Sequence, residues 1–208
     1  MGAPARRTTQ SATPAGAVGC LYAAGAGVLI PAMLLMWADG NGAGALILLV
    51  LLAASSIALG RRRARQAAEL RHVRMLQSTE VARYHAMNPR EFEHAVAFLC
   101  ERDGCQGAQV VGGAGDLGAD VVATAPDGRR LVIQCKRYGP TTKVGSPDLQ
   151  RFGGTCYSVH GAQVAVVVTT SVFTKPAAQY AVNSGIRLFD EAALAAWATR
   201  TGPAPWLL

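Results

Sequence analysis

Two long apolar runs come first in the chain, and charged side chains dominate only after them. The runs cover residues 15–38 and 43–60, contain no charged residue, and are joined by the turn-forming residues 39–42. A helix of roughly 20 apolar residues is long enough to cross a bilayer. The pattern therefore predicts a two-helix transmembrane hairpin over residues 15–60, behind a disordered tail at residues 1–14 that is rich in Ala, Thr and Pro.

Arginines flank this hairpin at both ends. They are Arg6 and Arg7 ahead of the first run and Arg61, Arg62, Arg63 and Arg65 behind the second. Because positively charged flanks stay on the cytoplasmic side, both ends of the hairpin are expected there. This predicts a multi-pass protein of the cell (inner or plasma) membrane whose soluble part faces the cytoplasm. Two alternatives stay open: a cleaved signal peptide for the first run, and a pair of buried core helices for both runs.

The stretch that follows the hairpin, residues 61–86, has the composition of a helix. Its apolar residues Leu70, Val73 and Leu76 are set among many charged ones. We expect a basic juxtamembrane helix whose arginines lie against anionic headgroups. A solvated linker helix is the alternative.

The net charge of +7 mostly reflects this predicted topology. Six of the 20 basic residues flank the apolar runs, whereas from Gln66 onward 14 basic residues stand against 12 acidic ones. A nucleic-acid-binding surface on the soluble part would therefore have to be a local patch.

Cysteine usage indicates a reducing compartment. The chain has five cysteines, an odd number, and no two of them are spaced as C-x-x-C, which argues against a disulfide framework and against a zinc site. The four histidines show no metal-ligand spacing either.

From residue 87 onward the pattern alternates between helix and strand. "MNPREFEHAVAFLCERDG" predicts a helix that is capped by Asn88, has Pro89 in its first turn and ends at Gly104. Strand-like runs follow at 108–113, 119–125 and 130–138. A helix comes next, capped by Ser146 and weakened by Gly153-Gly154, and after it a strand at 162–171, a helix at 175–185, a strand at 186–190 and a helix at 191–200. This order predicts an α/β domain over residues 87–208, with a mixed sheet flanked by helices.

The stretch "LVIQCKRYG" departs from the pattern of a core strand. Three apolar residues lead into Gln134 and Lys136, and a lysine at the end of a core strand costs free energy unless it is used there. Side chains alternate along a strand, so Gln134 and Lys136 share one face while Cys135 and Arg137 take the other. The strand end is therefore the candidate site.

Asp120 begins the strand that precedes this one along the chain. The two are joined at residues 126–129, where Asp-Gly between apolar runs is typical of a hairpin. A two-residue turn would put Asp120 on the wrong face. A three-residue loop or a bulge is needed to bring it to the face of Gln134 and Lys136. With that shift, a carboxylate, an amide and an ammonium group meet at one end of the sheet.

This set of side chains suits metal-assisted hydrolysis of a phosphodiester. Carboxylate oxygens such as those of Asp120 favour Mg²⁺, with Mn²⁺ as the alternative, and the ion would lower the pKa of a bound water. Lys136 would position that water or stabilise charge on the phosphate, and the backbone carbonyl of Cys135 would complete the coordination. No small-molecule cofactor is expected, because the glycines at 112, 113 and 115 lead into a strand and not into a helix.

Four segments resemble one known family. "GDLGAD", "VIQCKRY", "VVVTTSVFT" and "GIRLFD" are similar to the catalytic domain of Mrr-type restriction endonucleases, a branch of the PD-(D/E)xK nuclease superfamily, over residues 87–197. The resemblance implies a restriction-endonuclease-like fold in which Asp120 is the metal-binding aspartate and Lys136 the catalytic lysine. It also implies that Gln134 takes the intervening ligand position and that Glu93 is the auxiliary acid.

The same resemblance suggests further site residues. Asp116 is the fallback carboxylate, because it lies in the same loop as the predicted ligand. Lys143 and Gln150 resemble positions near the substrate groove, and together with Arg137 they are predicted DNA contacts. Residues 1–86 hold the spans and the linker where some relatives carry a DNA-reading domain, so the recognised sequence or base modification is not predicted.

These observations lead to one prediction and two alternatives. We expect a membrane-anchored, Mg²⁺-dependent DNA endonuclease that acts on foreign or modified DNA, as a homodimer if it cuts both strands. The first alternative is a non-catalytic binding module of nuclease fold, favoured by the small charge excess of the soluble part and by the neutral Gln134. The second is a structural membrane protein with an incidental domain.

Overall fold

The structure is a computed structural model that describes residues 42–113 and 115–208. The predicted tail and the first predicted membrane span, residues 15–38, lie outside the described residues. Within the described part, one helix is long and apolar enough to cross a membrane, judged by length and composition alone. The two-span hairpin therefore stays a prediction.

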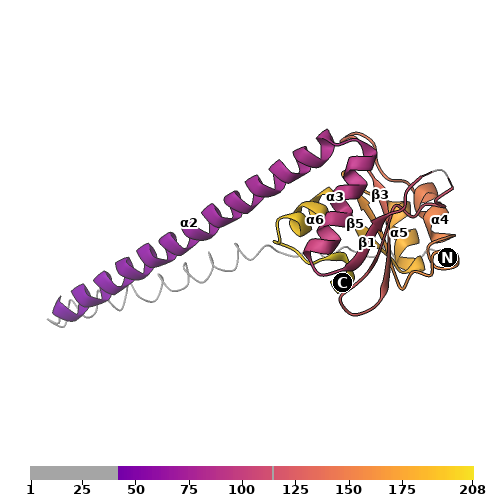
Figure 1. Cartoon of the computed structure of the whole chain (residues 1–208). Helices are drawn as coiled ribbons and strands as arrows, with labels where there is room; N and C mark the ends of the chain where they lie inside the picture. The colour runs from indigo at the N-terminus through magenta and orange to yellow at the C-terminus, as the bar shows by residue number, and fades with distance from the viewer. Residues whose placement is uncertain (1–41, 114) are drawn as a thin grey trace, which may run out of the picture. The chain divides into compact units, whose positions relative to one another are not determined.

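That helix is α2, Gly42–Ala86, and it has 45 residues. It contains the second predicted span and continues through residues 61–86 without a break (Figure 1). Its apolar window has a mean hydropathy of 2.4 and none of it is buried. The juxtamembrane helix predicted from sequence is thus the C-terminal part of α2 and not a separate element.

Residues from Ala68 to Leu208 form a compact unit around one five-stranded sheet. The strands are β1 (Gln106–Val110), β2 (Val121–Thr124), β3 (Arg130–Lys136), β4 (Val164–Thr169) and β5 (Ile186–Phe189). They lie in the order β1-β2-β3-β4-β5, with β1, β2 and β3 antiparallel and β3, β4 and β5 parallel. The mixed sheet predicted from the order of elements is confirmed.

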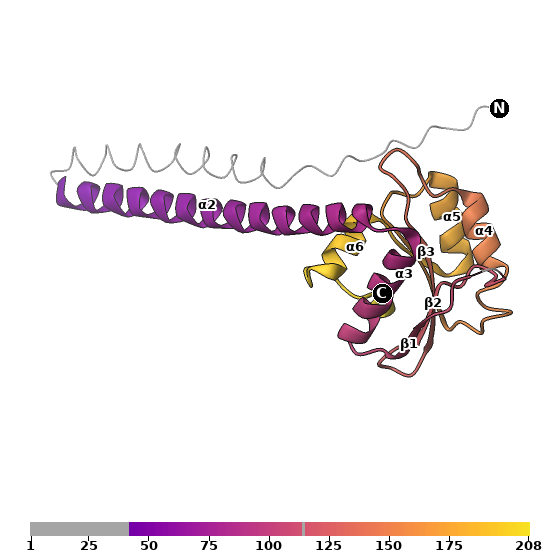
Figure 2. The ribbon, with the colours of Figure 1, turned by 45° about the horizontal axis from the view of Figure 1, so that its top comes forward.

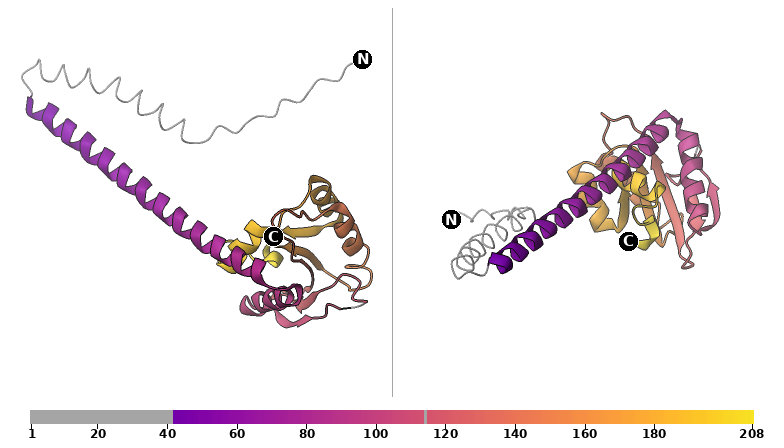
Figure 3. Two further views of the ribbon diagram at one scale, coloured as in Figure 1. Left: turned by 90° about the horizontal axis from the view of Figure 1, so that it is seen from above. Right: turned by 90° about the vertical axis from the view of Figure 1, so that its left-hand side faces the viewer.

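Helices cover both faces of this sheet. They are α3 (Pro89–Arg102), α4 (Ser146–Gly153), α5 (Lys175–Ser184), α6 (Glu191–Ala198) and the 3-10 turn η1 (Pro205–Leu207). α3 and α6 lie on one face, and α4 and α5 lie together on the other (Figures 2 and 3). The fold is therefore a three-layer arrangement with β3 at its centre.

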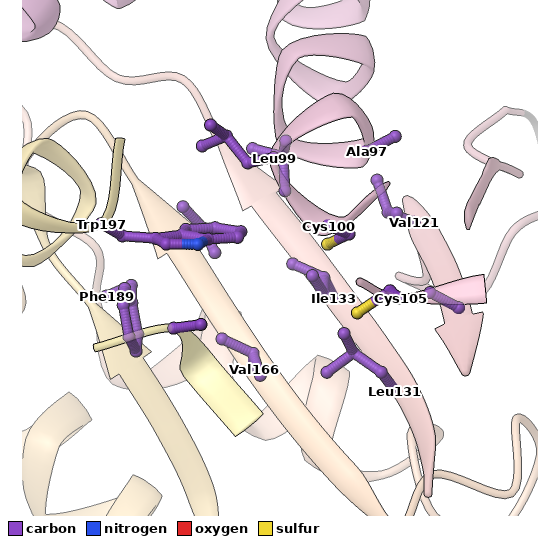
Figure 4. Close-up of a cluster of buried hydrophobic side chains, with 14 of the residues drawn as sticks. Ala97, Leu99, Cys100, Cys105, Val121, Leu131, Ile133, Val166, Phe189 and Trp197 are labelled. Atoms are coloured by element: carbon purple, nitrogen blue, oxygen red, sulfur yellow. The ribbon is translucent and has the colours of Figure 1, made fainter. Parts of the chain in front are cut away.

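Two apolar clusters, one on each face, hold the layers together. Figure 4 shows the cluster under α3 and α6, where Leu131 and Ile133 of β3 meet Leu99 and Trp197. Val132 of β3 belongs to the cluster under α4 and α5. The side chains of β3 thus alternate between the faces, as the sequence pattern predicts.

The ends of α3 follow from its sequence. Asn88 accepts a hydrogen bond from the Glu91 N–H (2.9 Å) and the Glu91 carboxylate accepts one from the Asn88 N–H (2.8 Å), which is the reciprocal capping arrangement. At the other end the N–H of Cys105 donates to the carbonyl of Cys100 (2.9 Å), around Gly104 with φ of 94°. Both predicted boundaries are confirmed, although the Asp103 cap precedes the glycine.

The β2–β3 hairpin has a three-residue loop. The N–H of Ala125 donates to the carbonyl of Arg129 (2.9 Å), and Val121 lies opposite Ile133. This register differs by one residue from the one that a two-residue turn would give. Because a shift of one residue exchanges the two faces of a strand, the loop fulfils the condition that the sequence set for Asp120.

One predicted cap is wrong. Ser146 is the first residue of α4 and not its cap, because Gly145 takes the extended conformation that precedes the helix. The helix ends at Gly153, where the sequence pattern had already weakened.

Candidate active site

A cavity of about 410 Å³ opens beside the C-terminal end of β3. It is lined by Gly115, Asp116, Leu117, Gly118, Asp120, Gln134, Lys136, Arg151 and Thr155. The structure therefore brings Asp120, Gln134 and Lys136 together, as strand alternation and the hairpin loop predict.

Asp120 is fixed by β3 next to it. Its N–H donates to the carbonyl of Ile133 (3.0 Å), and its Oδ2 accepts a hydrogen bond from the N–H of Cys135 (2.6 Å). Burial raises its pKa to about 6; the Cys135 N–H lowers it, the negative charges of Glu93 and Asp116 raise it, and Lys136 lowers it. A buried carboxylate near other acids is held in its charged form most readily by a neighbouring cation.

Glu93 reaches Asp120 from α3, across the backbone of Gly112. A β-carbon placed on Gly112 would lie 2.9 Å from Glu93 Oε2 and 3.2 Å from Asp120 Oδ1. The two carboxylates therefore flank the same glycine, and only the absence of a side chain leaves room for both. Arg90 supports this arrangement, because its Nη1 donates to Glu93 Oε2 (3.1 Å) and to the carbonyl of Gly112 (2.6 Å).

Gln134 is the buried polar side chain of the site. It is 3% exposed, and among the described residues its Oε1 has no hydrogen-bond partner. Its Nε2 lies close to Gly118, where a β-carbon would be 3.1 Å away. A buried amide oxygen without a partner costs free energy, so a ligand that accepts its lone pair would stabilise the protein.

Cys135 contributes backbone and not thiol chemistry. Its side chain packs against the cluster under α3 and α6, and burial raises the pKa of its thiol well above the usual value. Its N–H is already committed to Asp120. The predicted use of its carbonyl as a metal ligand stays a prediction.

Two cationic side chains line the cavity, Lys136 and Arg151. Within residues 42–113 and 115–208, neither forms an ion pair with a carboxylate. The end of β3 that carries Lys136 is held by β4, since Thr169 Oγ1 donates to the Lys136 carbonyl (2.7 Å). Both cations are thus available to an anionic ligand.

The remaining predicted residues lie outside the cavity lining, apart from Asp116. Arg137 directly follows β3, and its Nη1 donates to the carbonyl of His85 (3.4 Å). Lys143 and Gln150 are exposed, and the Gln150 Nε2 donates to Ser146 Oγ (2.9 Å). Their contact with DNA stays a prediction.

Asp116 lies in the cavity wall but serves its own loop. Its Oδ2 accepts from the N–H of Gly113 (2.8 Å) and its Oδ1 from the N–H of Gly118 (2.9 Å). With both oxygens occupied, Asp116 is better suited to shaping the loop than to the fallback ligand role.

Sequence analysis missed Arg151, Thr155 and Gly112. Arg151 precedes the buried Phe152 in α4, so helical spacing marks it as lying off the buried face. Its place at the cavity depends on how α4 is rotated on the sheet, which no local pattern gives. The role of Gly112 depends on two side chains from other elements, and it carried no signal beyond being a glycine.

The donor set is compatible with a divalent ion that prefers oxygen. Over the described ranges, no three His, Cys, Asp or Glu side chains are grouped closely enough to hold a metal by themselves. Asp120 and Glu93 supply two carboxylates around Gly112. Gln134 lines the same cavity as Asp120, and its Oε1 has no hydrogen-bond partner in the described part of the chain. Hard ions such as Mg²⁺ take carboxylate and carbonyl oxygens and usually keep several waters, so the residues present fit such an ion.

Comparison with known proteins agrees with the geometry. Residues 84–198, more than half of the chain, match the family model of the Mrr catalytic domain, described as "Restriction endonuclease". No curated protein matches the chain significantly.

Solved structures with similarity to the chain are matched over part of their length. The DNA modification-dependent restriction endonuclease AspBHI has 19% identity and a TM-score of 0.48, over 63% of this chain and 36% of that chain. The MspJI restriction endonuclease, in complex with a 27-mer oligonucleotide, has 20% identity and a TM-score of 0.41, over 64% and 32%. A protein of unknown function has 26% identity and a TM-score of 0.41, over 50% and 58%. The chain thus spans less than two thirds of each of them.

Proposed function

Because the chain belongs to the restriction endonuclease family, we propose that it is a divalent-metal-dependent DNA endonuclease whose active site is the cavity at the end of β3. The observation that carries the proposal is the meeting of Asp120, Gln134 and Lys136 in that one cavity, inside the matched segment. Three side chains with distinct chemistry converge there although nothing in core packing requires it.

The metal would be held by Asp120, Glu93 and Gln134. Their oxygens are those of two carboxylates and of one buried amide, whose oxygen has no hydrogen-bond partner among the described residues. When bound there, a divalent ion supplies Lewis-acid chemistry, activating a water and offsetting negative charge on the phosphate. Mg²⁺ is the proposed ion and Mn²⁺ its substitute.

The chain's own residues bind and orient the phosphate. Lys136 lines the cavity without an ion-pair partner in the described part of the chain, so its ammonium is free to donate to a phosphate oxygen where charge develops. Arg151 provides a second donor on the α4 side of the cavity. Hydrogen bonds from the Cys135 N–H to Asp120 and from Arg90 to Glu93 keep the carboxylates in place.

A membrane anchor is a further part of the proposal. The N-terminal part of α2 is apolar and unburied, and arginines follow it at residues 61–65. We propose that it crosses the inner membrane as part of the predicted hairpin and leaves the catalytic domain in the cytoplasm, where it meets DNA. Cleavage of both strands by one active site per chain would use two copies of the chain.

Plasmid nicking tests the proposal. Full-length protein in a neutral detergent is incubated with supercoiled plasmid in Mg²⁺, Mn²⁺ or EDTA, on methylated and unmethylated DNA. Nicking that requires the ion and is lost in Asp120→Ala is the expected result, and a preference for methylated DNA would assign the substrate. A folded protein that leaves both plasmids intact with either ion would contradict it.

A non-catalytic binding module is the second candidate, favoured by the neutral Gln134 in a ligand position. A thermal melt distinguishes the two, because a ligand of the folded state raises the melting temperature. The endonuclease requires a Mg²⁺-dependent rise that is lost in Asp120→Ala. The module predicts no rise at millimolar Mg²⁺.

A further inference from the structure

Two non-glycine residues of the described chain have a positive φ, Leu117 at 48° and Arg200 at 56°. Arg200 is explained by the helix before it. It follows the cap of α6, and the N–H of Thr201 donates to the carbonyl of Ala196 (2.8 Å), as in an ordinary left-handed helix end. Leu117 follows no helix, so its backbone conformation needs another reason.

Leu117 occupies a tight turn that suits other residues better. The N–H of Ala119 donates to the carbonyl of Asp116 (3.1 Å), and the two residues between them, Leu117 and Gly118, have φ of 48° and 90°. Two positive φ values in succession are those of a type I′ turn, in which Asn-Gly is strongly preferred. Leucine is a poor choice there, because a bulky side chain in the left-handed region crowds the backbone.

Hydrogen bonds from three sides hold the turn in place. The Asp116 carboxylate accepts from the N–H of Gly118 (2.9 Å) and of Gly113 (2.8 Å). From the α4 side, Thr155 Oγ1 donates to the carbonyl of Leu117 itself (2.6 Å). The bonds to the Gly118 N–H and to the Leu117 carbonyl both hold the peptide group that follows Leu117, and the bond from Ala119 to the Asp116 carbonyl holds the one before it.

Core packing does not explain the leucine either. Leu117 is 53% exposed as a residue, and it belongs to neither apolar cluster. It lines the same cavity as Asp120, Gln134 and Lys136. Leu117 thus combines an exposed apolar side chain with a strained backbone, and it does so at the wall of a polar cavity. Backbone strain of this kind clusters at sites of ligand contact.

We propose that Leu117 packs against a nucleoside of the bound DNA, next to the phosphate held in the cavity, and so positions the strand. This inference rests on the proposed function. A sugar or base face is the apolar surface that DNA offers beside a phosphate, and apolar side chains are used in this way by proteins that grip or wedge DNA. Lys136 and Arg151 would neutralise the phosphate, while Leu117 would contribute contact without charge.

The absence of charge gives the inference a specific signature. A residue that neutralises a phosphate contributes to the salt dependence of DNA affinity, and its loss lowers the slope of log Kd against log salt by about one. Loss of an apolar contact weakens binding equally at every salt concentration. The two roles are therefore distinguishable with one titration series.

The experiment compares full-length Leu117→Asn, Leu117→Met and Arg151→Gln with wild type in neutral detergent. Fluorescence anisotropy of a labelled duplex is measured with Ca²⁺ in place of Mg²⁺, at several salt concentrations, and the DNA is checked for integrity afterwards. Asn suits the type I′ turn, so Leu117→Asn keeps the loop while removing the apolar group.

We expect Leu117→Asn to weaken DNA binding roughly fivefold and to leave the salt slope unchanged. A fivefold loss corresponds to removing the buried apolar area of about half a leucine side chain. Leu117→Met should stay within roughly twofold of wild type, because it keeps the apolar contact. Arg151→Gln should lower the slope by about one. Leu117→Gly repeats the test with a residue that adopts the turn without strain.

Three outcomes contradict the account at different levels. If wild type binds no DNA, the proposed function fails before Leu117 is considered. If wild type binds and Leu117→Asn binds equally well, the inference about Leu117 is overturned. A changed salt slope in Leu117→Asn would overturn it too, because the side chain would then act through the phosphate contacts.

Discussion

Asp120 shows how a single residue combines stability and function. Its carboxylate lies beside the C-terminal end of β3 and accepts a hydrogen bond from the N–H of Cys135. Its pKa is raised to about 6, chiefly by burial. In the unfolded chain the value is the ordinary one of 3.8. The folded protein thus binds this proton more tightly than the unfolded chain, which makes ionisation of Asp120 a cost to folding until a cation is bound.

The pH dependence of stability follows from that sign. In metal-free buffer the destabilising contribution of Asp120 should grow as pH rises from about 4 through about 6, and then level off. Asp120→Asn should therefore be more stable than wild type at pH 8 by about 1–2 kcal/mol, after allowance for the partial exposure of the group. Near pH 4 the difference should vanish.

Thermal melts in EDTA across this pH range measure the effect, which corresponds to several degrees in Tm at pH 8. Added Mg²⁺ should stabilise wild type and leave Asp120→Asn unchanged. If wild type and Asp120→Asn were equally stable at pH 8 without metal, burial would not disfavour the ionised form of the Asp120 carboxylate.

Gly112 offers a second test at the residue scale. A β-carbon there would approach Glu93 Oε2 to 2.9 Å and Asp120 Oδ1 to 3.2 Å, so Gly112→Ala should push the carboxylates apart. We expect Mg²⁺ affinity, read from the metal-dependent shift in Tm, to fall roughly tenfold.

Gly113→Ala is the matched control, because a β-carbon on Gly113 meets no atom within 4 Å among the described residues beyond its chain neighbours. It should bind Mg²⁺ like wild type. If both variants behave alike, the two carboxylates do not act together around Gly112.

At the scale of elements, the loop between β1 and β2 depends on α4. Thr155 Oγ1, just beyond α4, donates to the Leu117 carbonyl (2.6 Å) and so ties the loop to the helix layer. Thr155→Val removes the donor at nearly constant volume. Stability should fall by about 1 kcal/mol, and DNA affinity should fall as well, because the loop loses its fixed conformation.

Ser158→Ala is the control for that prediction. The Ser158 hydroxyl also donates to a carbonyl, that of Gly154 (2.9 Å), but it is exposed and outside the cavity lining. DNA binding measured by anisotropy should be unaffected by this change. Equal binding by Thr155→Val and Ser158→Ala would show that the tie to α4 is dispensable.

Local sequence signals predicted most of the elements but not their mutual placement. Asn88 and Gly104 marked both ends of α3, and alternation placed Gln134 and Lys136 on one face of β3. The sequence does not determine the register of the β2–β3 hairpin, because Asp127-Gly128 permits a loop of either two or three residues. Arg151 was missed since its position depends on packing between layers, which is a property of the whole sheet.

For the whole molecule, α2 raises the question of topology. Its N-terminal part is apolar and unburied, whereas its last turns contribute Tyr84 to the core beneath α3. The two-span hairpin predicts that a reporter at Gly40 is periplasmic and that one at Leu208 is cytoplasmic. Alkaline phosphatase and fluorescent-protein fusions measure this directly, and the reverse pattern would separate the domain from cytoplasmic DNA.

The central claim is that the cavity at the end of β3 cuts DNA, and Lys136 tests it most directly. The measurement is the initial rate of plasmid nicking in Mg²⁺ by full-length wild type, Lys136→Met and Lys175→Met, with folding checked by thermal melts. Lys175 is exposed, lies outside the cavity lining and has no predicted contact with DNA, so it is the matched lysine. We predict that Lys136→Met slows nicking by roughly a hundredfold or more while Lys175→Met stays within a few-fold of wild type. Nicking by folded Lys136→Met at the wild-type rate would contradict the account.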